Sequence, residues 1–185
     1  MVKGGAFRMI QPWLISHRAD PDSRAIADRH YNRQKIGATG FVPPGRCLVL
    51  RLDPRWGSAL WVTSWPFAAY VRHAWAGHWV NSCFRNEGGD VIQSSWLIRR
   101  ALAATVAKWP EANAAMITFI DPSKVRHKRD LGRCYRRAGF RPVGSTKGGL
   151  AAFELPASEM PEALPAGYGG LFAGQILKPA LEETP

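Results

Sequence analysis

A short apolar run, a basic loop and a glycine-terminated helix follow one another in residues 116–140, the segment that most constrains the fold. Residues 116–120, MITFI, are β-rich and are bounded by Asp121-Pro122, which predicts a buried strand rather than a helix. Asp121 then lies at the carboxyl end of the strand, where open sheets usually bind ligands. Residues 131–138 predict about two helical turns ended by Gly139. We expect Tyr135 on this helix to face Asp121, so that a phenol and a carboxylate converge.

The charge of the chain is strongly positive and unevenly spread. There are 25 Lys and Arg residues against 14 Asp and Glu, a formal net charge of +11. Residues 121–147 hold nine basic and two acidic residues, whereas residues 154–185 hold five Glu and one Lys. A basic body with an acidic C-terminal segment favours a polyanion such as nucleic acid as the partner. A basic protein without such a partner stays as the alternative, because charge alone is weak evidence.

Length and composition predict one globular domain with a tail. The 185 residues are 46% hydrophobic and include eight tryptophans, so we expect a domain at residues 1–155 and a loosely attached, Pro/Gly-rich acidic tail at residues 156–185. The three cysteines form no CxxC pair, which argues against a disulfide framework and a zinc ribbon. The chain shows neither a signal-peptide pattern nor a run of 18 apolar residues. We therefore expect a cytoplasmic protein with reduced thiols and no membrane partner.

The order of the predicted elements indicates an α+β fold with a mostly antiparallel sheet flanked by helices. Besides the strand and helix above, the expected elements are a strand at 7–16, a helix from Asp20 to about residue 30, a Gly/Pro-rich loop at 33–46, strands at 47–52, 59–64 and 80–85, a helix at 93–109 and a hairpin at 141–155. This order, with a turn and a helix N-terminus after the fourth strand, resembles the GNAT acyltransferase fold. On order alone the resemblance is an analogy and indicates no activity.

The motif His30-Tyr31-x-Arg33 closes the first predicted helix and enters the Gly/Pro-rich loop. An imidazole acts as a base or a metal ligand near neutral pH, and an arginine clamps a carboxylate or a phosphate. We keep a metal at His30 as one option and do not name the ion. The other interpretation is a histidine favoured at a helix C-terminus by the macrodipole.

Two further sets of residues are candidates, each with a structural alternative. Arg85 lies before the long helix and Ser95 in its first turn, where backbone N–H groups bind anions. The GNAT acetyl-CoA signature, Gln/Arg-x-x-Gly-x-Gly/Ala, is not present there, and capping explains the serine equally well. Asp121 is a candidate proton acceptor and Tyr135 a candidate acid. The alternatives are a turn cap before Pro122 and an aromatic ring packed on the sheet.

Three short motifs together resemble the Mom family of phage DNA-modification proteins, a divergent GNAT branch. They are His30 to Arg33, the segment from Arg85 to Ser95, and FIDP…GRCYRRAGF at residues 119–140, and the resemblance spans roughly residues 25 to 145. The family converts adenine in DNA to an N6-carbamoylmethyl form that protects it from restriction. The loop after Asp121 is longer and more basic than the family's version.

The resemblance implies site residues and partners. His30, Tyr31, Asp121 and Tyr135 would surround the reacting centre, and Arg33, Arg85 and Ser95 would bind an unidentified small-molecule donor, with acetyl-CoA or a glycine-derived donor as options. Independently, the charge predicts that double-stranded DNA contacts Lys124, Arg126, Lys128, Arg129, Arg133, Arg136 and Arg137. The alternatives are a GNAT N-acetyltransferase acting on an amine or a protein, and a non-catalytic nucleic-acid-binding protein. The oligomeric state is open, with a dimer among the options.

Overall fold

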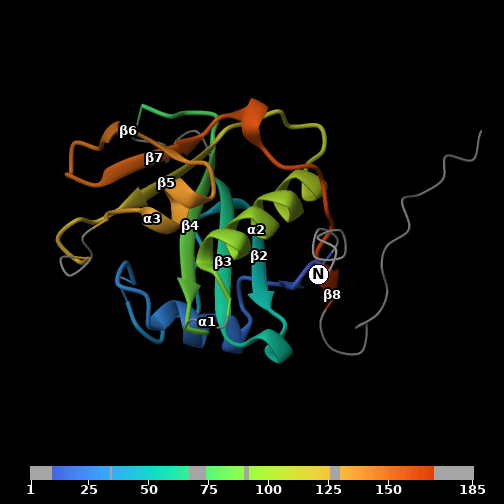
Figure 1. Ribbon diagram of the computed structural model, residues 1–185. Coiled ribbons are helices and arrows are strands. Elements are labelled where there is room, and N and C mark those ends of the chain that lie inside the picture. The colour runs from blue at the N-terminus through green and yellow to red at the C-terminus, as the bar shows by residue number, and fades with distance from the viewer. Residues whose placement is uncertain (1–9, 34, 67–73, 90–91, 126–129, 169–185) are drawn as a thin grey trace, which may run out of the picture.

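A single eight-stranded sheet forms the centre of the computed structural model, which describes residues 10–33, 35–66, 74–89, 92–125 and 130–168 (Figure 1). The strands lie in the order β6-β7-β5-β4-β3-β2-β1-β8. All neighbouring pairs are antiparallel except β4–β5 and β1–β8, which are parallel. The α+β class and the mostly antiparallel sheet are thus confirmed. The strands are β1 Trp13–Ser16, β2 Gly45–Leu52, β3 Ala59–Pro66, β4 Trp79–Asn86, β5 Met116–Ile120, β6 Arg141–Ser145, β7 Ala151–Leu155 and β8 Gly167–Tyr168.

Among the described residues, three α-helices flank this sheet: α1 Pro21–Asp28, α2 Ser94–Lys108 and α3 Arg133–Arg137. Helix α1 begins where predicted, because the Asp20 side chain accepts hydrogen bonds from the N–H groups of Asp22 and Ser23. Helix α3 is shorter than predicted. Gly132 takes a left-handed backbone with φ 70°, and a Cβ built there would lie 2.7 Å from the Phe153 ring. The helix therefore starts only after Gly132, and it stops, as expected, before Gly139 (φ 105°).

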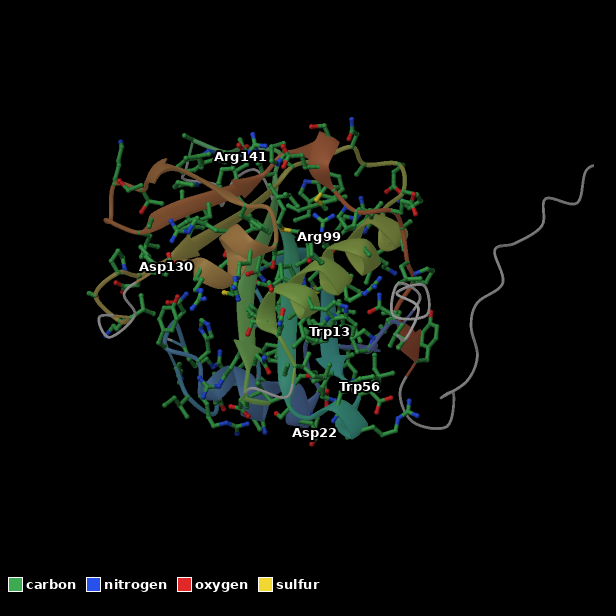
Figure 2. All side chains as sticks on the ribbon, viewed as in Figure 1. Trp13, Asp22, Trp56, Arg99, Asp130 and Arg141 are labelled. Atoms are coloured by element: carbon green, nitrogen blue, oxygen red, sulfur yellow. The ribbon has the colours of Figure 1, made fainter. Side chains whose placement is uncertain are left out.

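The helices cover both faces of the sheet. Helix α1 packs its Ile26 and Ala27 on one face, in a small cluster of buried residues that includes Val62 and Cys83. Helix α2 lies across the opposite face (Figure 1), above the larger core. Figure 2 labels Trp13 beside α2, where its indole N–H donates to the Leu97 carbonyl at 2.9 Å. The two faces are thus independently packed layers around one sheet.

The first part of the expected tail is joined to the domain. Residues 167–168 form β8, which pairs in parallel with Leu14 and Ile15 of β1. On the way there the Leu164 N–H donates to the Ala103 carbonyl of α2, and the Gln11 amide donates to the Leu164 carbonyl. Residues 156–168 are therefore not loosely attached. Residues 169–185, like residues 7–9 of the predicted first strand, lie outside the described residues.

Candidate functional site

The parallel strands β4 and β5 pair over only three residues and then diverge. Their ladder joins residues 79–81 to residues 116–118 and ends at Asn81 and Thr118. Beyond this point β4 continues along β3 and β5 continues along β7. At the same place β4 gains a residue relative to β3, since Asn81 pairs with Thr63 but Cys83 pairs with Val62. Such a bulge bends a strand locally, and here it accompanies the separation of the two strands, which we call the fork.

A cleft of about 800 Å³ opens at the fork, at the carboxyl ends of both strands. Its walls come from the turn after α1, the end of β4, the start of α2, the end of β5, and α3 with the loop before it. The predicted site residues that line it are His30, Tyr31, Arg85, Ser95, Arg133, Tyr135 and Arg137. Motifs separated by up to about a hundred residues in the chain thus meet in one place.

A buried polar cluster lies at the apex of the fork. The Tyr135 phenol donates a hydrogen bond of 2.6 Å to Asn81 Oδ1, and the Thr118 hydroxyl donates to the same oxygen at 3.2 Å. The Asn81 amide donates to the carbonyls of Val62 and Cys83, so every hydrogen-bonding group of this side chain is used. Burial raises the pKa of Tyr135 well above its ordinary value. The phenol is therefore a protonated donor at neutral pH.

The dipeptide His30-Tyr31 connects the two diverging strands. Next to β4, His30 makes a backbone hydrogen bond at Phe84, and the Tyr31 phenol makes one at Asp121, just after β5. The two rings stack with centroids 4.4 Å apart and planes at 27°. Burial, together with the nearby Arg85 charge, lowers the pKa of His30 to about 4. The imidazole is therefore neutral at pH 7, and its Nδ1 accepts the Asn32 N–H at 3.2 Å.

The predicted pair of Asp121 and Tyr135 is not formed. The Asp121 carboxylate accepts the N–H and the hydroxyl of Ser123, at 2.9 and 2.6 Å, and does not line the cleft. These bonds lower its pKa, the Ser123 hydroxyl most strongly, so the group is ionised. Asp121 thus takes the turn-cap role that was its structural alternative. Through its backbone it meets Tyr31 instead of Tyr135.

The arginines of the predicted donor site have separate positions. Arg85 lines the cleft and is held by Glu87 (Nε to Oε1, 2.6 Å) and by the Arg29 carbonyl (2.7 Å). Glu87 also binds Arg29, and these hydrogen bonds lower its pKa to about 2. Arg33 lies outside the cleft lining, where it binds Asp28 at 2.6 Å and the carbonyls of two loop residues. Arg33 therefore fixes the loop that carries Tyr31.

The start of α2 forms the wall next to Ser95. The helix begins after Gln93, whose side chain caps no N–H group. Asn86 organises the approach to the helix by donating to the Ile92 carbonyl and to the Ser94 hydroxyl. Because the first N–H groups of a helix have no partner within it, this wall suits an anionic group of a ligand. The sequence at this wall does not contain the GNAT acetyl-CoA signature.

Only some of the predicted DNA-binding residues line the cleft. Arg133 and Arg137, one helical turn apart on α3, line it. Lys124 is exposed on the loop after β5. Arg136 pairs with Asp130, which Figure 2 labels at the loop leading into α3. The remaining three, Arg126, Lys128 and Arg129, lie outside the described residues.

The hydrogen bonds that Asn81 accepts from Tyr135 and Thr118, and the ion pairs of Glu87, were not predicted. The signal for Asn81 is a polar residue at an inward position of an otherwise apolar alternation, Trp79-x-Asn81-x-Cys83. Burial raises the pKa of Cys83 to about 12, so this thiol is no nucleophile. Within the described part of the chain, no three His, Cys, Asp or Glu side chains are grouped as metal ligands. The same residues contain no helix of the length and apolarity needed to cross a membrane.

Comparison with protein-family models, curated proteins and solved structures finds no significant match for this chain.

Proposed function

We propose that this protein is a cytoplasmic transferase that modifies the N6 amino group of adenine in double-stranded DNA, as the resemblance to the phage Mom family implies. The observation that carries the proposal is the cleft at the fork. It brings the His30-Tyr31 motif, Arg85, Ser95 and Tyr135 together, although these residues come from three separate segments of the chain. The basic side chains of α3 at the same cleft favour a polyanionic substrate.

The topology supports a GNAT-like fold for this transferase. The strand order β6-β7-β5-β4-β3-β2-β1, with parallel β4 and β5 at its centre and a helix that starts after β4, agrees with the element order that the sequence shares with that fold. In this arrangement the start of α2 and Ser95 hold the anionic part of the donor. The electrophilic carbon is the methylene carbon of the carbamoylmethyl group that the donor carries, bonded to the leaving group.

The substrate adenine lies on the opposite side of the cleft, near His30 and Tyr31. The N6 nitrogen attacks the donor carbon, the N6–C bond forms, and the leaving group departs with the electron pair of the bond that breaks. N6 then loses a proton. Nδ1 of His30 already accepts the Asn32 N–H, and the ionised Asp121 carboxylate lies outside the cleft lining. We therefore assign the proton to Asp121 through one intervening water, beside Tyr31.

Adenine N6 is a weak nucleophile because its lone pair is delocalised into the ring, so positioning supplies much of the rate. Tyr135 serves this positioning. Its phenol is protonated and donates to Asn81 at the apex, and the residue lines the cleft, so the ring is a fixed part of the wall that the donor meets.

Nucleoside mass spectrometry on plasmid DNA from expressing cells tests the proposal. We expect a new adenosine species with wild-type protein and at least a hundredfold less with Asp121→Asn, the scale of a lost general base. Lys147→Ala, in the β6–β7 turn and outside the cleft lining, is the control and retains the product. Unaltered nucleosides in cells that contain folded wild-type protein would contradict the proposal.

The second candidate function, an N-acetyltransferase that uses acetyl-CoA, is favoured by the strand order alone. A ligand that binds only the folded state stabilises it by about 2.7 kcal/mol at a hundred times its Kd. A clear rise in melting temperature with acetyl-CoA, together with unmodified DNA, would therefore favour this candidate. Salt-dependent duplex binding without either effect would favour the third, a non-catalytic nucleic-acid-binding protein.

A further inference from the structure

An exposed aromatic side chain lies at the cleft. Tyr31 is 37% exposed, one of few large hydrophobic side chains that the described residues leave open to solvent. It also lines the cleft, and it stacks on His30 with a centroid distance of 4.4 Å. Exposed aromatic residues at a cleft, unlike scattered ones, indicate contact with a ligand.

The stacked pair is held rigidly from both sides. His30 is fixed by Phe84 and by the Asn32 N–H, and the phenol of Tyr31 is fixed at the backbone of Asp121. Arg33, which follows in the motif, clamps the loop through Asp28. The pair therefore neither folds into the core nor swings freely, and it loses little conformational entropy when a ligand stacks on it.

The chemistry of the pair suits a nucleobase. Bases stack on aromatic side chains irrespective of sequence because every base has a π-face. The cleft is also flanked by Arg133 and Arg137, whose guanidinium groups suit the phosphates on either side of a base. A base inside a duplex cannot enter such a cleft, so the ligand is a base that has left the helical stack.

We infer that His30 and Tyr31 form a stacking platform for an extruded adenine, so that the protein binds a duplex with an unpaired adenine more tightly than a fully paired duplex. This inference rests on the proposed function for the identity of the base. It goes further because it separates base capture from group transfer: the preference for the duplex with an unpaired adenine requires no group donor. Tyr31 is then a positioning residue for the substrate.

Fluorescence anisotropy with two labelled duplexes tests the platform in the absence of donor. The duplexes have the same sequence, but one adenine lies opposite thymine in the first and opposite an abasic site in the second. We expect wild-type protein to bind the second about tenfold more tightly, because the cost of extrusion is already met. Tyr31→Leu should remove this preference, whereas Tyr31→Phe, which keeps the ring and loses only the hydroxyl, should retain it.

Lys124→Ala is the control for phosphate contacts and should weaken binding to both duplexes by the same factor. An equal preference in wild type and Tyr31→Leu would overturn the platform. So would a loss in Tyr31→Phe as large as in Tyr31→Leu, since the phenol contact and not the ring would then matter. If adenosine is modified in cells but the binding preference does not depend on Tyr31, the stacking platform is wrong and the proposed transferase stands. The preference without modified adenosine would overturn the proposed transferase and leave the platform.

Discussion

Aromatic side chains lie on both sides of the point where β4 and β5 separate, but they have different surroundings there. On the paired side, before Asn81, the rings of Trp65, Trp79 and Trp109 contact one another with centroids about 6 Å apart, an aromatic packing distance. Trp79 is only 1% exposed. On the open side, beyond Asn81, Tyr135 binds a polar partner and Tyr31 faces the cleft.

On the proposed function, this difference places stability on the paired side of the two strands and chemistry on the open side. Where the ladder is intact, the side chains between the sheet and α2 are buried in the larger core and stabilise the fold by burial. Where it ends, the same strands present polar groups to a cleft, and each buried polar group requires a partner. We therefore expect substitutions on the paired side to reduce stability, and those on the open side to reduce function more than stability.

The largest expected effect is on the paired side. Trp79→Ala should lower the free energy of unfolding by about 3–5 kcal/mol, because it leaves a large cavity beneath the neighbouring tryptophans. Urea denaturation measures this loss. Ile36→Ala, at a side chain that is 75% exposed, is the control and should stay within about 0.5 kcal/mol of wild type. A Trp79→Ala loss below about 1 kcal/mol would show that the paired side is not the stabilising half.

Asn81→Ala at the apex should have the next largest effect. It leaves the Tyr135 phenol and the two backbone carbonyls without their partner, at a cost of about 2–3 kcal/mol. Tyr135→Phe removes one hydrogen bond only and should cost about 1 kcal/mol. Equal losses in the two variants, measured by the same denaturation, would mean that Asn81 is not the centre of the cluster.

The pH dependence of stability should reveal the half-buried His30. Its folded-state pKa, about 4, lies below the ordinary 6.5, so the unfolded chain takes up the proton first as the pH falls. Stability is then fully present above about pH 6.5 and decreases by about 2 kcal/mol between pH 7 and pH 5. Glu87 contributes only at lower pH, below its ordinary value of 4.5 and down to about 2.

Chemical denaturation at pH 7 and pH 5 measures this decrease. His30→Gln should flatten the curve in this window. A slope that persists in His30→Gln would place the responsible group elsewhere.

Arg46 on the paired side should have a smaller effect. Its guanidinium carbon lies 5.0 and 5.5 Å from the ring centroids of Trp65 and Trp109. Arg46→Ala should therefore lower stability by about 1 kcal/mol, the scale of a partly exposed cation–π contact. The loss should be seen in the urea midpoint, with DNA binding unchanged.

The smallest effect concerns one phosphate contact on the open side. Arg133→Ala should reduce the slope of log affinity against log salt by about 0.9, without a change in stability. Anisotropy titrations of one duplex at several salt concentrations give this slope. An unchanged slope would remove Arg133 from the DNA-binding surface.

Local patterns predicted most of the elements. The apolar run of β5, the stripe of α2 and the Asp20 cap each depend on neighbouring residues, and all were found close to the predicted positions. Contacts between distant segments were not predictable in this way. Tyr135 binds Asn81 because a bulge in β4 places that amide at the apex, and no spacing in the sequence encodes the bulge. Likewise the two residues of β8 carry no local signal for parallel pairing with β1.

The sequence indicated which residues gather at the candidate site better than it indicated the contacts that they make there. His30, Tyr31 and Tyr135 line one cleft, as their motif positions suggested. Asp121 instead accepts hydrogen bonds within its own loop, and Arg33 binds Asp28 and the loop after α1. Short polar side chains such as Asp121 compete for backbone N–H groups next to them in the chain, and such local bonds form whether or not a site is nearby.

The most direct test of the division between the two sides compares Tyr135→Phe with Arg46→Ala, two variants with a similar expected cost in stability of about 1 kcal/mol. The yield of modified adenosine in plasmid DNA is measured for both by mass spectrometry, at equal amounts of folded protein. We expect Arg46→Ala to remain within about twofold of wild type, because Arg46 lies outside the cleft lining. Tyr135→Phe should fall at least tenfold, because the ring loses the hydrogen bond to Asn81 that positions it in the cleft. Equal yields in the two variants would contradict the assignment of chemistry to the fork.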